Sequence, residues 1–246
     1  MNIRDFFSVK SKTKPKETKD TQETKKEEIN KNIDESKYIG HEEVEEIDID
    51  ESKPKFMIGK YNLYNMFLEK KKKNYNIMIK HFGKSEKIKF KLSYLKSPFG
   101  VEMYSHKEIV NLEFTNHETN NLSFNNYTIF KQLDDMFGKL NTKTEESNNF
   151  ININSYQLNS LNGLHYSPLL KERPNNYDPL ARFHLRKVKN TIATKCYKKV
   201  DGKLEQISVF EIKGKMMEVE LELSSLWISD DSYGIVIVIN QITIIG

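Results

Sequence analysis

Residues 216–245 read MMEVELELSSLWISDDSYGIVIVINQITII, and this stretch decides the fold class. From Met217 to Leu223, apolar residues alternate strictly with glutamates, which predicts a half-buried strand over Met216–Ile228. Ile235–Ile239 is apolar at every position, so we expect Tyr233–Ile245 to form a central strand that is covered on both faces. The two segments together predict a long β-hairpin.

The turn of this hairpin lies close to the single tryptophan of the chain. Asp230–Ser232 predicts the turn itself, and Gly234 marks a bulge or a close approach of two segments. Trp227 and Tyr233 flank the turn, where they either meet at an exposed rim or pack in the core.

Outward from the hairpin, period-two alternation recurs along most of the chain and predicts five more strands. These are Tyr75–Lys80, Lys87–Leu95, Lys107–Phe114, Ala181–Lys189 and Thr191–Val200. An apolar stripe predicts a helix over Asn125–Leu140, capped by Asn125 or Asn126, and a shorter stripe predicts a second helix over Tyr61–Lys73. The expected fold is mostly β with an inserted helix: an OB-like curled antiparallel barrel over residues 56–246.

Residues 1–55 differ from this body in composition. They carry 12 basic and 15 acidic residues, so the remaining sequence holds 27 of the 39 basic and 20 of the 35 acidic ones, a net charge of +7. Ser11–Glu28 has no aliphatic or aromatic side chain, and His41–Glu51 is an acidic run. Such segments bury too little surface to offset the entropy of ordering, which predicts a disordered tail. A basic body with an acidic extension is typical of proteins that handle nucleic acid.

Composition also excludes several classes of protein. One cysteine rules out an intramolecular disulfide framework and multi-cysteine metal sites, and no motif for another metal or a cofactor is found. There is no run of about 18 apolar residues, so no membrane helix is expected. The first residues lack the apolar core of a signal peptide, which predicts an intracellular protein.

Ile3, Phe6 and Phe7 form an apolar cluster in the polar tail, spaced so that one helical turn would place them on one side. The order Ile-x-x-Phe-Phe resembles the sliding-clamp-binding box of replication proteins, and MNIRDFF is similar to the start of the large subunit of the replication-factor-C clamp loader. The glutamine that usually precedes this box is missing. A chance cluster of apolar residues is the alternative.

Basic and aromatic residues are interleaved on two predicted strands. Arg182, His184 and Arg186 share one face of the first strand, next to Lys187, and the second strand adds Lys195, Tyr197 and Lys199. Adjacent strands of this kind form a groove that pairs phosphates and stacks bases, although an ordinary solvated sheet face has the same pattern. Upstream, Lys96 precedes a turn, Ser97–Val101, in which Phe99 is either a core residue or an exposed platform.

Taken together, residues 87–245 resemble the single-stranded-DNA-binding family shared by short-tailed phage replisomes and nucleocytoplasmic large DNA viruses. The resemblance lies in the PFG turn, the helical insertion, the strands ARFHLRKVK and TKCYKKVDGK, and the closing LW and YGIVIVINQI segments. It implies an OB barrel that coats single strands during replication or repair at sites of DNA synthesis, with other replisome proteins as partners, and the box at residues 3–7 adds a sliding clamp as a candidate partner. A homodimer is left open. The implied DNA contacts are Lys96, Phe99, Arg182, Arg186, Lys187, Lys195, Tyr197, Trp227 and Tyr233.

Two other functions remain as alternatives. Asp201, Glu211 and Lys213 have the spacing of a Mg²⁺-dependent nuclease, in which the carboxylates hold the metal and the lysine orients water. Asp201-Gly202 is also an ordinary turn sequence, and Glu-x-Lys arises readily in a chain that is 30% charged. The second alternative is a scaffold that binds the clamp through its first residues and does not bind DNA.

Overall fold

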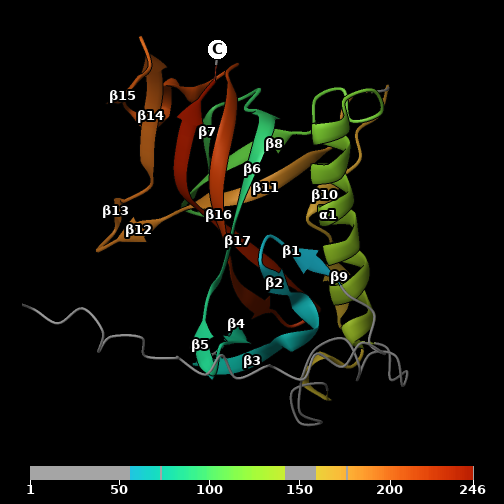
Figure 1. Cartoon of the computed structure of the whole chain (residues 1–246). Coiled ribbons are helices and arrows are strands. Elements are labelled where there is room, and N and C mark those ends of the chain that lie inside the picture. The colour runs from blue at the N-terminus through green and yellow to red at the C-terminus, as the bar shows by residue number, and fades with distance from the viewer. Residues whose placement is uncertain (1–55, 73, 142–158, 176, 246) are drawn as a thin grey trace, which may run out of the picture. The chain divides into compact units, whose positions relative to one another are not determined.

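A computed structural model describes residues 56–72, 74–141, 159–175 and 177–245 (Figure 1). The predicted clamp-binding box, the acidic run and the tail boundary at residue 55 lie outside these ranges. Within them, no helix combines the length and the apolar character needed to cross a membrane.

Five strands close into a ring that forms the body of the fold. They are β6 (Ile88–Lys96), β8 (Lys107–Glu113), β11 (Leu180–Leu185), β17 (Ser232–Ile244) and β16 (Met216–Ile228), in that order around the ring. β11 and β17 run parallel and the other neighbours antiparallel, and β6 meets β8 only at Lys96 and Glu113. This is the strand order of a partly open OB barrel. The predicted curled barrel is confirmed, but the sheet is mixed rather than wholly antiparallel, because β9, β11 and β14 all run parallel to β17.

The remaining strands extend the ring at its edges. β3 (Met66–Lys71) and β4 (Asn74–His81) continue from β16 and are followed by β5 (Lys84–Glu86), while β14 (Lys195–Val200) and β15 (Lys203–Gln206) continue from β17. The short strands are β1 (Met57–Ile58), β2 (Tyr61–Asn62), β7 (Val101–Tyr104), β9 (His165–Ser167), β10 (Leu170–Lys171), β12 (Lys187–Val188) and β13 (Thr191–Ile192). The 3₁₀ turns are η2 (Leu63–Asn65), η3 (Lys139–Asn141) and η4 (Val209–Ile212).

Three element predictions need correction. The helix predicted over Tyr61–Lys73 is instead β2, η2 and β3, because Met66 and Leu68 alternate with less buried residues and pair with β4. The strand predicted over Ala181–Lys189 ends at Leu185, and the one over Thr191–Val200 is interrupted after Ile192. β12 and β13 pair with each other as a separate two-stranded hairpin.

The inserted helix α1 (Asn121–Gly138) is confirmed, with a different start. Asn120 caps it, since its side-chain oxygen accepts from the amides of Leu122 and Ser123. Asn126, which the sequence suggested as a cap, is buried one turn inside and donates to the carbonyl of Ser93 on β6 at 2.6 Å. The predicted stripe is buried, at Phe130, Leu133, Met136, Phe137 and Leu140 in particular.

Two register shifts divide the long hairpin and decide which side chains face outward. On β16, Met217 to Leu223 point every second residue into the core, but after the shift at Ser224 the buried residue is Leu226. A bulge of this kind turns the following side chains to the opposite face. Ser225 and Trp227, which a regular strand would bury, therefore face outward.

Candidate nucleic-acid interface

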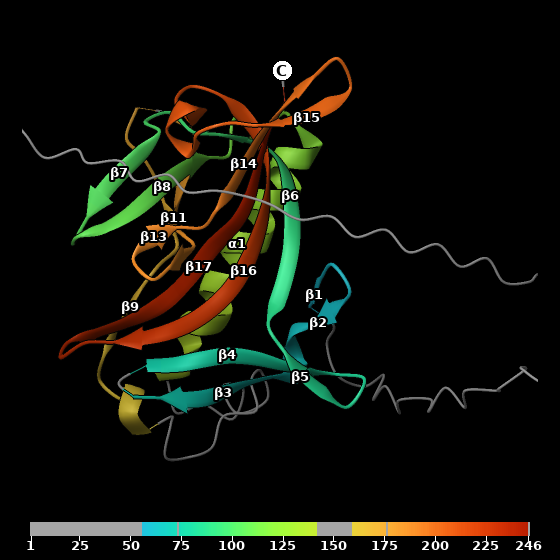
Figure 2. The same cartoon turned by 90° about the vertical axis from the view of Figure 1, so that its left-hand side faces the viewer.

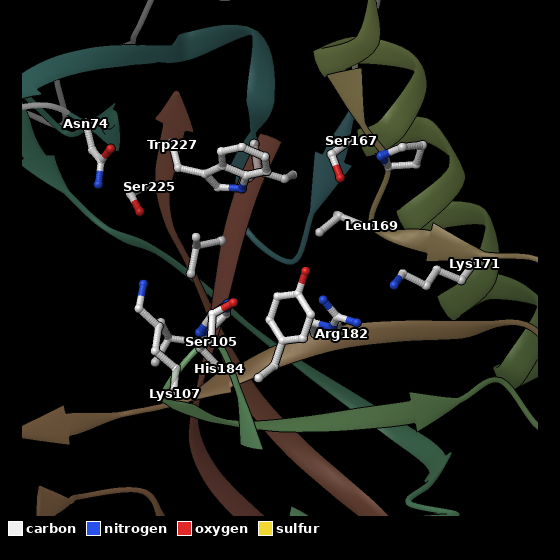
Figure 3. A pocket seen from close by; sticks show the side chains of 15 residues that line it. Asn74, Ser105, Lys107, Ser167, Leu169, Lys171, Arg182, His184, Ser225 and Trp227 are labelled. Carbon is white, nitrogen blue, oxygen red and sulfur yellow. The ribbon is translucent and has the colours of Figure 1, made fainter. Parts of the chain in front are cut away.

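A groove of about 550 Å³ lies on the outer face of β11, β17 and β16, beside the β7–β8 hairpin (Figure 3). The β7–β8 and β16–β17 hairpins extend on the same side of the barrel, as Figure 2 shows. The groove is lined by Asn74, Tyr104, Ser105, Lys107, Ser167, Pro168, Leu169, Lys171, Arg182, His184, Ser225, Trp227, Ile235, Val236 and Val238.

The charge of the groove has one sign. Lys107, Lys171 and Arg182 contribute positive charge, and none of the lining residues in the described part of the chain is an aspartate or a glutamate. Among the described residues, the charged side chains of this lining are all basic, which favours an anionic ligand.

Arg182 supplies the most distinctive donor of the groove. Its guanidinium carbon lies 3.8 Å from the ring centroid of Tyr104, at the end of β7, which is a close cation–π contact. Its Nε is buried and has no hydrogen-bond partner among the described residues. A buried donor without an acceptor is costly. The residue also lines the groove, where its positive charge is placed to attract a phosphate.

Trp227 lies at the other end of the groove, opposite Gly234 in the cross-strand register. A Cβ at Gly234 would lie 2.8 Å from the indole, so only glycine lets the indole pack against β17. The predicted close approach at Gly234 is thus confirmed. The half-exposed indole is held against the strand while it lines the groove, an arrangement that suits stacking on a base.

Tyr233 does not share this surface. It is 0% exposed, and its hydroxyl donates to the carbonyl of Phe137 in α1 at 2.8 Å. Its cross-strand partner is Ile228 rather than Trp227, so the two aromatic residues do not meet across the hairpin. The prediction of Tyr233 as a DNA contact is therefore wrong: it is a core residue.

The floor of the groove corrects the expectation that Ile235–Ile239 is covered on both faces. Ile235, Ile237 and Ile239 are buried, but Val236 and Val238 are only half-buried, and both line the groove. The second face of β17 thus gives an apolar floor beneath the cationic side chains.

Asp134 of α1 holds one wall of the groove in place. Its carboxylate accepts from the hydroxyl of Tyr166 and the amide of Leu169, both at 2.7 Å, and from the amide of Leu170 at 3.0 Å. Burial raises the pKa of this carboxyl, although the three hydrogen bonds oppose the rise. These bonds fix the segment that carries Leu169 and Lys171, so the inserted helix supports the wall.

His184 stands beside Arg182 on the outer face of β11. Burial, and then the charges of Lys107 and Arg182, lower the pKa of His184 to about 4. The imidazole is therefore neutral near pH 7, and the positive charge of the groove comes from its lysines and its arginine.

The other predicted contacts lie away from the groove. Arg186 donates through Nε to Asn240 at 2.5 Å and forms an ion pair with Glu222, while Lys187 pairs with Glu108. Lys195 and Tyr197 belong to β14, which pairs with β17 beyond the end of β11. Lys96 and Phe99 lie at the connection from β6 to β7, where Gly100 packs against Lys213, and neither of them lines the groove.

The structure does not arrange Asp201, Glu211 and Lys213 as the metal site that their spacing in the sequence suggested. Asp201 occupies the tight turn between β14 and β15, and Glu211 lies in η4. The Glu211 carboxylate completes a capping box by accepting from the amide of Ser208 at 3.0 Å. Among the described residues, no group of three or more His, Cys, Asp or Glu is placed to hold a metal ion.

Tyr104, Lys107 and Lys171 are groove residues that sequence reasoning missed. Tyr104 and Lys107 are a cross-strand pair at the tip of the β7–β8 hairpin, where Ser105 and His106 both have positive φ. A Tyr-Ser-His-Lys tip between two alternating segments is a readable hairpin signal. Lys171 had no comparable signal, because the segment that carries it is placed by Asp134 from a distant part of the chain.

Comparison with known proteins gives only a remote structural likeness. No protein-family model matches the chain, and no curated protein is significantly similar to it. Three solved structures of the single-stranded DNA-binding protein from bacteriophage Enc34 are similar to 73% of this chain at 12% sequence identity. A C-terminal truncation has a TM-score of 0.37 with 92% of that chain covered, a complex with ssDNA 0.38 with 94%, and a third structure 0.37 with 88%. Scores of this size carry no argument about the site, which rests on the geometry of this chain.

Proposed function

We propose that this protein binds single-stranded DNA in the groove without altering it covalently. The observation that carries the proposal is the Arg182 guanidinium, which is stacked on Tyr104 in the groove. Among the described residues its buried Nε has no partner and the groove lining has no carboxylate. The groove lies on the outer face of β11, β17 and β16, with Lys107 of β8 at its border, so it includes part of the second- and third-strand face through which OB folds bind oligonucleotides.

The binding mechanism has two parts. Arg182, Lys107 and Lys171 pair with phosphates and release their counterions, which gives log K a slope of about −0.7 per phosphate against log salt. Trp227 and Tyr104 offer ring faces to bases, worth about 1–3 kcal/mol per stacked base. Neither part depends on the identity of the base, so binding is largely independent of sequence.

The direct test is fluorescence anisotropy of end-labelled oligo(dT) titrated with the full chain, with Mg²⁺ and with EDTA. Salt-dependent binding of an oligonucleotide that stays intact on a denaturing gel supports the proposal, and unlabelled duplex should compete poorly. Absence of binding in dilute buffer would overturn the proposal, and Mg²⁺-dependent cleavage would favour the nuclease instead.

We further propose a role in DNA replication or repair, with Ile3, Phe6 and Phe7 as a tether to a sliding clamp. The support is the spacing of these residues in a polar segment. A variant with alanine at all three positions should lose clamp binding in a pull-down and keep its affinity for oligo(dT). Unchanged clamp binding would refute the tether and leave the DNA site unaffected.

A further inference from the structure

The outer face that carries Trp227 continues beyond the groove onto two more strands. β4 pairs with β16 through Asn76–Ser225 and Tyr75–Leu226, so the same register places Asn74 beside Trp227. β3 pairs with β4, and Lys71 is the partner of Asn74. Directly paired residues share a face, so Trp227, Asn74 and Lys71 form one row across three strands.

Burial agrees with this assignment of faces. On β4, Tyr75 and Ile77 are buried, whereas Asn74 is exposed and also lines the groove. Lys71 is exposed, and Lys72 follows it in the turn with positive φ. The tip of the β3–β4 hairpin thus presents two lysines beside the Trp227 end of the groove.

Two hairpin tips lie near Trp227, where a DNA strand could leave the groove, and they differ in charge. The tip of the β16–β17 hairpin carries Asp230 and Asp231, which are exposed and repel phosphates. The tip of the β3–β4 hairpin carries Lys71 and Lys72. A polyanion that leaves the groove past Trp227 is attracted to the lysines and turned away from the aspartates.

We propose that Lys71 and Lys72 form a second phosphate-binding site, which holds the part of the DNA strand that leaves the groove past Trp227. This inference rests on the proposed function. The sheet runs from β11 through β17, β16 and β4 to β3, which makes four interstrand gaps, or about 19 Å at the usual spacing between strands. The groove extends to Asn74 on β4, so Lys71 and Lys72 lie one strand beyond its edge, and an oligonucleotide bound at Arg182 must be long enough to pass Trp227 before it contacts them.

The test measures affinity against length for oligo(dT) of about 4 to 16 nucleotides, the range of site sizes known for OB folds. The variant is Lys71→Ala with Lys72→Ala. For the longest oligonucleotides, its salt slope should fall by about 1.4, the value for two lost phosphates, with several-fold weaker binding. For the shortest ones, wild type and variant should bind equally.

The matched control is Lys80→Ala with Lys84→Ala, which removes the same charge at the opposite end of β4. It should behave as wild type at every length. Equal weakening of the Lys71/Lys72 variant at all lengths, or no weakening at the greatest length, would overturn the second site. If wild type binds no oligonucleotide of any length, the proposed function itself has failed, so the two failures are distinguishable.

Discussion

Arg182 of β11 and Arg186, which follows the end of β11, lie four residues apart, yet their surroundings differ. Arg186 is bonded to Asn240 and Glu222, and its own amide donates to Thr194 and Ile239. Arg182 stacks on a single ring and leaves a buried donor without a partner. Arg186 joins strands of the barrel, and Arg182 lines the groove.

The residues around Arg186 and those around Arg182 differ in the same respect, namely whether their charges are bonded within the protein. Around Arg186, charges are paired inside the protein: Glu222 is only 7% exposed, and the ammonium of Lys87 donates to the carbonyl of Ser224 at 2.6 Å. Around Arg182, the charged residues that line the groove are all basic within the described ranges. The same basic segment thus contains one arginine that is bonded within the protein and one that lines the groove. Only the hydrogen-bond and ion-pair partners in the structure distinguish the two.

The largest effect is expected at the paired end, on stability. Arg186→Ala leaves the nearly buried Glu222 carboxylate without its partner and should lower the free energy of unfolding by about 2–3 kcal/mol. Urea denaturation followed by circular dichroism measures the loss. Arg182→Ala in the same assay should be close to neutral, and equal losses for both variants would remove the contrast between them.

At the groove end, Trp227→Ala should have the largest effect on binding. Loss of a stacked base costs about 1–3 kcal/mol, or about 5- to 150-fold in affinity, while the salt slope stays unchanged. Anisotropy with labelled oligo(dT) at several salt concentrations measures both quantities. Trp227→Phe, which keeps a ring, is the matched control, and a variant equally weak with either substitution would argue against stacking.

Arg182→Ala, unlike Trp227→Ala, should change the salt dependence of binding as well as the affinity. It removes one phosphate contact, so affinity should fall about tenfold and the salt slope by about 0.7. The same salt series measures the change. Arg182→Lys keeps the charge but loses the planar stacking on Tyr104, so it should restore the slope and only part of the affinity. An unchanged slope in the alanine variant would place the phosphates elsewhere.

The smallest effect concerns pH and His184, which stands between the two arginines. Because its folded pKa is about 4, below the unfolded value of 6.5, the unfolded chain binds more protons in between, and stability is lost as pH falls through this window. The loss between pH 6.5 and 5 should be on the order of 1 kcal/mol after allowance for partial exposure. His184→Gln should flatten this part of the pH–stability curve, measured by denaturation at several pH values. A curve as steep as that of wild type would contradict the burial of a neutral imidazole.

Sequence patterns predicted the barrel better than the site. Period-two alternation located β6, β8, β16 and β17, because one face of each is packed in the core. It could not locate the shift at Ser224, which turns Trp227 outward, because the pairing of three strands sets that register. The one local sign of this shift in the sequence is the Ser224-Ser225 pair, because the buried apolar residues fall at odd positions up to Leu223 and at an even position, Leu226, after it.

The same limit applies to the charged residues. The pattern ARFHLRKVK predicted that Arg182, His184 and Arg186 share a face; Arg182 and His184 both line the groove, while Arg186 lies just beyond the end of β11. It could not show that Glu222 and Asn240, from the closing hairpin, engage Arg186. Lys195 and Tyr197 were predicted to extend the groove because they follow in sequence, but β14 pairs with a later part of β17.

The most direct test of the groove uses Trp227, the single tryptophan of the chain, as its own probe. Its fluorescence should be quenched in a saturable way by oligo(dT), and the midpoint should move to higher oligonucleotide concentration when salt is raised. Arg182→Ala should reduce that movement while the quenching at saturation is retained. If oligo(dT) binds by anisotropy and the emission of Trp227 does not change, the DNA lies elsewhere and the groove is not its site.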